Sequence, residues 1–84
     1  MKLIFSPAAT KALLRAPAEV SRDLIAKLRM VADDPRGTYP WARRSTDQPG
    51  FRVRQGDWRA IYRLDHAASE MIVDRIAKRD QVYR

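Results

Sequence analysis

The sequence contains no cysteine, a single histidine and no long apolar run. The lack of cysteine excludes a disulfide framework and a cysteine-based zinc site, and it is compatible with a reducing cytoplasm. His66 cannot build a metal site alone, so we expect no metal. No stretch approaches the roughly 20 apolar residues that span a bilayer, and the opening MKLIFSPAATK turns polar too early for a secretory signal. We therefore expect a cytoplasmic protein without membrane contact.

Positive charge is what the chain has in excess. Its 84 residues include 17 Lys and Arg against 10 Asp and Glu, which gives a formal net charge of +7. The excess is shared by both halves of the chain, so we expect one basic domain over residues 1–84 without a basic tail. Such a charge favours a polyanionic partner, nucleic acid above all, with simple solubility as the alternative.

The chain opens with the pattern of a short strand followed by a helix. KLIF at 2–5 is an apolar run that ends at Ser6. Ser6 can cap a helix and Pro7 suits its first position, where the missing N–H is not needed. The apolar spacing in AATKALLRA predicts two or three helical turns, which Pro17 ends.

A second helix is expected from residue 18 to 34, and it stops before Pro35. Helical spacing divides its residues into two sides. The apolar stripe comprises Val20, Leu24, Leu28 and Val31 with Ile25 beside it, and the expected wet side comprises Arg22, Asp23, Lys27 and Arg29. The two helices together predict a helical hairpin.

Residues 35–50 contain three prolines and two glycines and have no steady period, so a loop is expected. Within it, Tyr39 and Trp41 are expected to fold back onto the core, because large aromatic side chains are seldom left free. Arg43 and Arg44 are expected to be exposed and are candidates for RNA binding.

The period then changes to two. FRVR and WRAIYRL alternate apolar and polar residues and meet at Gly56 and Asp57, which predicts a tight hairpin. EMIVDRIA at 70–77 is expected to be a third consecutive strand, apolar on both faces and inside the sheet. The whole order predicts an α+β domain: an N-terminal strand, a helical hairpin on one face of a mostly antiparallel sheet, and a three-stranded meander.

A two-residue hairpin loop fixes which side chains share a face. It places Arg54 opposite Arg59 and Arg52 opposite Ile61, so that the three arginines gather on the face away from the core. A like-charge pair opposite one another should destabilise the sheet by some tenths of a kcal/mol. Solvated charges, or pairing with Asp57 or Asp74, remain an alternative. A cluster of forked guanidinium groups nevertheless suits phosphate oxygens.

The C-terminal RIAKRDQVYR adds Lys78, Arg79, Tyr83 and Arg84 just after the last strand. A tyrosine beside basic residues can stack on a base or transfer a proton, and the alternative is a tail with one anchoring aromatic. Arg84 is a further candidate for RNA binding. His66 falls in the turn at the far end of the hairpin, so we interpret it as a turn residue and not as a base.

FRVRQGDWRAIYRLD, followed by IVDRIAKRDQVYR, resembles the RelE/ParE superfamily of bacterial toxins, in its RelE-like branch. The resemblance implies a RelE-like microbial RNase fold and a type II toxin that enters the ribosomal A site, cuts messenger RNA there and so inhibits translation. It implies that no metal or other cofactor is needed, because the 2′-hydroxyl of the RNA is the nucleophile. It also implies a cognate antitoxin, with the toxin monomeric alone and hetero-oligomeric with that partner.

The resemblance assigns roles to particular residues. Arg52 and Arg54 match paired basic residues that contact the scissile region, and Arg59 matches an arginine that supports the phosphate. Arg79 matches an arginine after the last strand. Tyr83 matches a tyrosine that stacks on the messenger or assists proton transfer.

The chain also departs from the family pattern. Some members have lysine where this chain has Arg52 and Arg54, and others have histidine at the position of Lys78, so no general base is obvious. Lys78 or Tyr83 could serve if nearby cations depress its pKa. Two alternatives stay open: a ParE-like inhibitor of DNA gyrase, and a basic RNA-binding module without catalysis. The segment from Arg79 to Tyr83 favours the ribonuclease.

Overall fold

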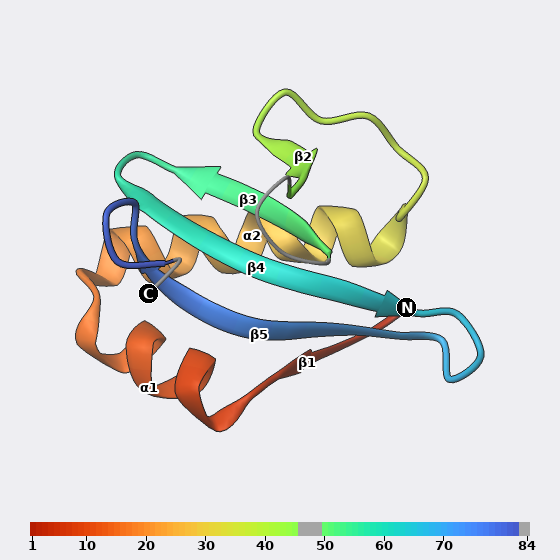
Figure 1. Ribbon diagram of the computed structural model, residues 1–84, viewed down its shortest axis with the longest axis horizontal. Coiled ribbons are helices and arrows are strands. Elements are labelled where there is room, and N and C mark those ends of the chain that lie inside the picture. Colours follow the sequence, from red (N-terminus) through yellow and green to blue (C-terminus); the bar gives the residue numbers. More distant parts are fainter. Residues whose placement is uncertain (46–49, 83–84) are drawn as a thin grey trace.

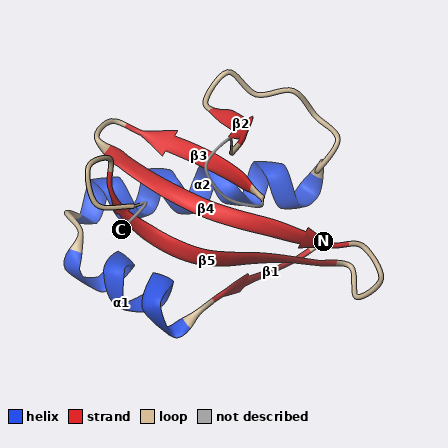
Figure 2. Cartoon of the chain, viewed as in Figure 1, coloured by secondary structure: helices blue, strands red, loops and turns tan. Residues whose placement is uncertain are grey.

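The computed structural model describes residues 1–45 and 50–82, which form an α+β fold with a five-stranded sheet (Figure 1). In chain order the elements are β1 (Lys2–Phe5), α1 (Pro7–Arg15), α2 (Ala18–Asp33), β2 (Ala42–Arg44), β3 (Phe51–Gln55), β4 (Trp58–Asp65) and β5 (Glu70–Lys78). The sheet order is β1-β5-β4-β3-β2, with β1 parallel to β5 and the other neighbours antiparallel. The predicted strand, helical hairpin and meander are confirmed (Figure 2).

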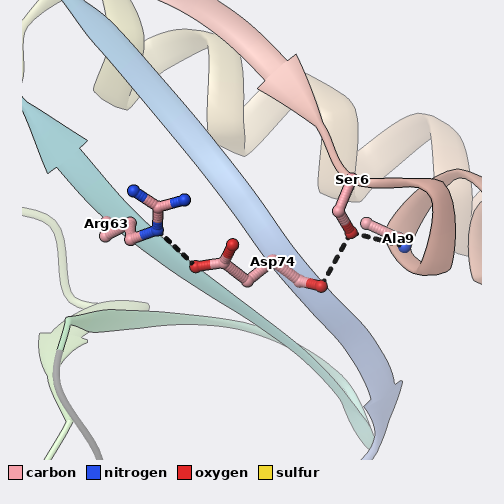
Figure 3. A network of polar contacts seen from close by, with 4 residues as sticks. All are labelled: Ser6, Ala9, Arg63 and Asp74. Carbon is pink, nitrogen blue, oxygen red and sulfur yellow. Dashed lines mark hydrogen bonds and ion pairs between the residues drawn. The ribbon is translucent and has the colours of Figure 1, made fainter.

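Ser6 joins the first strand to the first helix and to the sheet. Its Oγ accepts a hydrogen bond from the N–H of Ala9 at 3.0 Å, which caps α1, and donates one to the carbonyl oxygen of Asp74 in β5 at 2.8 Å (Figure 3). Pro7 is the first residue of α1, and the helix ends at Arg15, before Pro17. The capping prediction is therefore confirmed, and the same hydroxyl fixes α1 against β5.

The second helix ends at Asp33, one residue earlier than expected, with Asp34 as its C-cap before Pro35. Most of its predicted apolar stripe faces the sheet. Leu24, Leu28 and Val31 are buried, Val20 is partly buried against the core, and Ile25 is half-buried. Ala32 joins the buried set. Lys27, expected on the wet side, is instead half-buried.

The core lies between the two helices and one face of the sheet. From the helices it takes Ala9, Leu24, Leu28, Val31 and Ala32, and from the strands Val53, Ala60, Tyr62, Met71, Val73 and Ile76. We call this side of the sheet the helix face and the opposite side the open face. Of the described residues, neither helix forms a stretch long and apolar enough to cross a membrane.

Residues 35–50 are not entirely a loop, which corrects the sequence prediction. Ala42–Arg44 forms the edge strand β2, and Arg43 pairs with Arg52 of β3. Three residues are too few to show a period, so pairing with a strand further along the chain decides this element. Tyr39 and Trp41 fold back onto the core as expected, with their rings stacked at 4.8 Å between centroids.

The hairpin register is confirmed, with Gln55 opposite Trp58 and Arg54 opposite Arg59. Between β4 and β5 the register shifts: Ile61 pairs with Arg75, whereas Tyr62 pairs with Val73. Asp74 is therefore the extra residue of a β-bulge. Because a bulge changes which side chains share a face, Met71 and Val73 before it and Ile76 after it all reach the core.

Candidate functional site

Arginines from three neighbouring strands meet on the open face. Arg54 of β3 lies opposite Arg59 of β4, and Arg52 lies opposite Ile61. The edge strand adds Arg43, which pairs with Arg52. The predicted gathering of Arg52, Arg54 and Arg59 on one face is therefore present, and β2 extends it.

These arginines line a cavity of about 190 Å³, which we call the arginine pocket. Its lining residues are Pro40, Trp41, Arg43, Arg52, Arg54, Arg59 and Arg79. Guanidinium groups stay protonated at physiological pH, so the wall of the cavity carries permanent positive charge. The aromatic and proline side chains supply the apolar part of that wall.

The tip of the β3–β4 hairpin holds two of the arginines in place. Nη1 of Arg59 donates hydrogen bonds to the carbonyl oxygens of Gly56 at 2.7 Å and Trp58 at 2.9 Å. The N–H of Arg79 donates to the carbonyl oxygen of Asp57 at 2.7 Å, which ties the chain after β5 to the same tip. Figure 1 shows this dark-blue segment beside the green hairpin. The guanidinium group of Arg59 and the backbone at Arg79 are therefore both held by the hairpin tip.

The β-bulge decides which C-terminal residue enters the pocket. After the bulge, Ile76 faces the core and Lys78 pairs with Trp58, so Lys78 points to the helix face. Arg79 comes one residue later and lines the arginine pocket. Without the extra residue Asp74, the alternation of side chains along β5 would place Lys78 on the open face and Arg79 on the helix face.

Several candidates from the sequence lie apart from the pocket. Lys78 lines a separate groove of about 470 Å³ that it shares with Trp58 and residues of α1. The guanidinium carbon of Arg44 lies 5.7 Å from the ring centroid of Phe51, which packs against the core, so Arg44 is on the helix face. His66 is exposed in the turn at 66–69, as expected. Tyr83 and Arg84 fall outside the described residues.

Asp74 does not neutralise the arginine pocket. Its Oδ2 lies 3.0 Å from Nε of Arg63, further along β4 (Figure 3). Both side chains of this ion pair are largely exposed, so it contributes little to stability. The alternative in which Asp74 pairs with the clustered arginines is therefore excluded by this geometry.

The turn after β5 covers the open face beside the pocket. Nη2 of Arg75 donates a hydrogen bond to the carbonyl oxygen of Gln81 at 2.9 Å. Ile61 pairs with Arg75 and is 4% exposed, and Val82 is 1% exposed, although neither belongs to the core cluster. The turn therefore lies over part of the open face.

Lys27 of α2 is the neighbour of the pocket that the sequence analysis missed. Its Nζ donates a hydrogen bond to the carbonyl oxygen of Arg54 at 2.8 Å and lies 5.4 Å from the ring centroid of Trp41. Burial, and then the charge of Arg54, lower the pKa of Lys27 below its usual value, while Asp23 raises it. The helical pattern alone could not show that this lysine reaches the edge of the sheet.

The arrangement suits the binding of phosphate and the stabilisation of negative charge. Several forked donors converge on one small cavity, and one of them, Arg59, is held by the hairpin tip. Arginine keeps its proton, so these side chains cannot act as a general base. A proton acceptor has to come from another residue or from the substrate's surroundings.

No family model and no curated protein matches the chain. Solved structures do match. The archaeal RelE-RelB complex from Pyrococcus horikoshii aligns at 16% identity over 96% of this chain and 97% of its own, with a TM-score of 0.77. The YoeB/ParE toxin from Agrobacterium tumefaciens aligns at 17% identity over 93% of this chain and 98% of its own, with a TM-score of 0.76. The isolated E. coli RelE toxin aligns at 19% identity over 92% and 82%, with a TM-score of 0.71. The chain therefore has the fold of the RelE/ParE toxins.

Proposed function

We propose that the chain is the toxin of a type II toxin-antitoxin system and inhibits translation by cutting messenger RNA on the ribosome. The observation that carries this proposal is the arginine pocket, where arginines from β2, β3, β4 and the C-terminal turn surround one cavity. The fold supports it, since similar structures are named as toxins or as a toxin-antitoxin complex. Such a pocket fits a polyanionic ligand that is bound through its phosphate groups.

In the proposed reaction the 2′-hydroxyl of the RNA attacks the adjacent phosphorus, and the bond to the 5′-oxygen of the next nucleotide breaks. The products are a cyclic phosphate and a free 5′-hydroxyl. Arg52, Arg54 and Arg59 would hold the phosphate and stabilise the charge that develops on it, and Arg79 would join them. Arg43 would bind the neighbouring backbone.

The proton of the 2′-hydroxyl needs an acceptor, and we assign that role to Tyr83. Lys78, the other candidate base, lies on the helix face, and so does Arg44. Arg44 and Arg84 remain candidates for RNA contacts. Tyr83→Phe keeps the ring and removes the hydroxyl. It should lower cleavage by roughly 100-fold or more if the tyrosine transfers a proton, and it should stay active if the tyrosine only stacks.

A cognate antitoxin is the proposed partner. The net charge of +7 predicts that an acidic or amphipathic segment of the antitoxin covers the arginine pocket. Co-expression with the product of an adjacent acidic reading frame should restore growth, and the purified pair should melt at a higher temperature than the toxin alone. An adjacent acidic protein that neither binds nor protects would contradict the pairing.

Primer extension on a defined messenger in a reconstituted translation mixture tests the function. We expect cuts that map to the codon in the ribosomal A site, and a loss of those cuts without ribosomes. If translation continues and DNA gyrase is inhibited instead, the chain is a gyrase inhibitor. If the protein binds RNA without cutting it, the chain is an RNA-binding module.

A further inference from the structure

Lys27, expected on the wet side of α2, adjoins the buried stripe of that helix and is itself half-buried. Leu24, Lys27, Leu28 and Val31 follow the i, i+3, i+4, i+7 spacing of a buried stripe, and the other three are buried. A cation here is partly desolvated and lies beside the positive charge of Arg54. Both effects disfavour the charged form, whereas the hydrogen bond and the ring contact of its ammonium group favour it.

The contacts of Lys27 fall on two residues of the arginine pocket. The pairing between β2 and β3 ends where Ala42 meets Val53, so Arg54 lies one residue beyond the paired part of β3. The N–H of Arg54 still bonds to the carbonyl oxygen of Trp41 at 2.8 Å, and its own carbonyl oxygen accepts from Nζ of Lys27 at 2.8 Å. The same ammonium lies 5.4 Å from the ring centroid of Trp41. One side chain thus reaches both the strand end that carries Arg54 and the aromatic wall.

We propose that Lys27 is a positioning residue of the arginine pocket. From α2, its ammonium group holds the carbonyl oxygen of Arg54 and the ring of Trp41 in place. Its positive charge also adds to the field that attracts RNA phosphate. It does not line the cavity and bonds to a backbone oxygen, so it acts through the residues that do line it. The proposal rests on the proposed function in one respect, namely that this pocket binds RNA.

The test compares Lys27→Met and Lys27→Arg with a matched control, Lys2→Met. Lys2 is exposed in β1, at the opposite edge of the sheet, so its replacement removes the same charge far from the pocket. Binding of a short fluorescein-labelled single-stranded RNA is measured by fluorescence anisotropy, and each variant is melted in parallel. Lys27→Met should bind roughly threefold to tenfold more weakly than Lys2→Met, as for loss of one hydrogen bond.

The melting temperature separates positioning from simple loss of structure. Lys27→Met removes a partly desolvated charge but also a hydrogen bond and a ring contact, and because these changes oppose each other it should melt close to the wild-type temperature. Lys27→Arg should restore binding. Equal binding by Lys27→Met and Lys2→Met would overturn the inference, as would a parallel fall in binding and melting temperature, or a failure of Lys27→Arg to restore binding.

The same titration distinguishes this inference from the proposed function. In one outcome the wild-type protein binds RNA and Lys27→Met binds it more weakly, but the wild-type protein does not cut messenger RNA on ribosomes. This outcome would overturn the proposed function alone. A wild-type protein that cuts, with Lys27→Met no weaker than Lys2→Met, would overturn the inference alone. A wild-type protein that does not bind RNA would overturn both.

Discussion

The two faces of the sheet are built from alternate residues of the same strands and differ in almost every respect. Across the helix face, Val53, Ala60 and Ile76 form one row of neighbours, and all three are buried. Across the open face, Arg43 and Arg52 stand side by side in the adjacent row. One residue along a strand therefore separates a side chain that packs from a side chain that carries charge.

The two faces contribute differently to stability. Apolar neighbours on the helix face bury surface against α1 and α2, which drives folding. Like charges opposite one another, as in the pair of Arg54 and Arg59, destabilise a sheet. The like-charge pairs of the open face thus oppose folding, and they fit the negatively charged ligand proposed above.

The largest expected effect on folding comes from the helix face. Leu24→Ala deletes a fully buried side chain and should lower the free energy of unfolding by roughly 2 to 5 kcal/mol. Leu14→Ala makes the same chemical change on α1, where the side chain is 82% exposed, and should cost less than roughly 0.5 kcal/mol. Urea unfolding of both variants measures the contrast. Similar costs at the two positions would contradict the assigned core.

Lys78 and Arg79 are neighbours in sequence on opposite faces, so they give the sharpest functional contrast. Arg79→Ala should lower messenger cleavage by roughly 100-fold to 1000-fold, and Arg59→Ala likewise, because each removes a guanidinium donor that lines the arginine pocket. Lys78→Met should leave cleavage nearly unchanged, since its side chain lies in another groove. Primer extension measures all three. A loss with Lys78→Met equal to that with Arg79→Ala would contradict the face assigned by the bulge.

Alkaline pH should lower the free energy of unfolding through Tyr62, which lies on the helix face. Burial raises the pKa of Tyr62 from 10.0 to about 12. Between these values the unfolded state loses the phenolic proton while the folded state keeps it, so stability falls as pH rises, by roughly 2 to 3 kcal/mol in all. Unfolding free energies at pH 9 to 12 for wild type and Tyr62→Phe should diverge in this window. A constant difference between them would show that Tyr62 is not responsible.

The smallest expected effect has opposite signs for stability and binding. Arg54→Thr removes the like-charge pair with Arg59 and should raise the free energy of unfolding by roughly 0.2 to 1 kcal/mol. The same variant should bind RNA more weakly, because a pocket arginine is lost. Thermal melts and RNA titrations of one preparation test both. An Arg54→Thr protein that is less stable than wild type and binds RNA normally would contradict both expectations, namely that this arginine opposes folding and that it binds RNA.

Local patterns were sufficient to predict most of the fold. The capping serine and Pro7 mark the start of α1, and the period-two segments around Gly56 and Asp57 fix the register that brings Arg54 opposite Arg59. These features depend on residues close together in sequence. The RelE-like fold expected from the resemblance is confirmed as a fold.

The remaining features depend on contacts that a local pattern does not contain. β2 is a strand only because Arg43 meets Arg52. The bulge at Asp74, invisible in an apolar strand, decides that Arg79 and not Lys78 enters the pocket. The helical pattern assigns Lys27 to the wet side of α2, so its contact with the sheet edge appears only in three dimensions.

The salt dependence of RNA binding tests most directly whether the open-face arginines hold phosphate. The logarithm of the binding constant of single-stranded RNA is measured against the logarithm of salt concentration for wild type, Arg52→Ala, Arg59→Ala and, as control, Arg29→Ala on exposed α2 surface. We predict that each pocket variant binds more weakly with a slope reduced by about 0.7, whereas the control keeps the wild-type slope. Equal slopes and affinities in all four proteins would contradict the assignment of the arginine pocket to RNA phosphate.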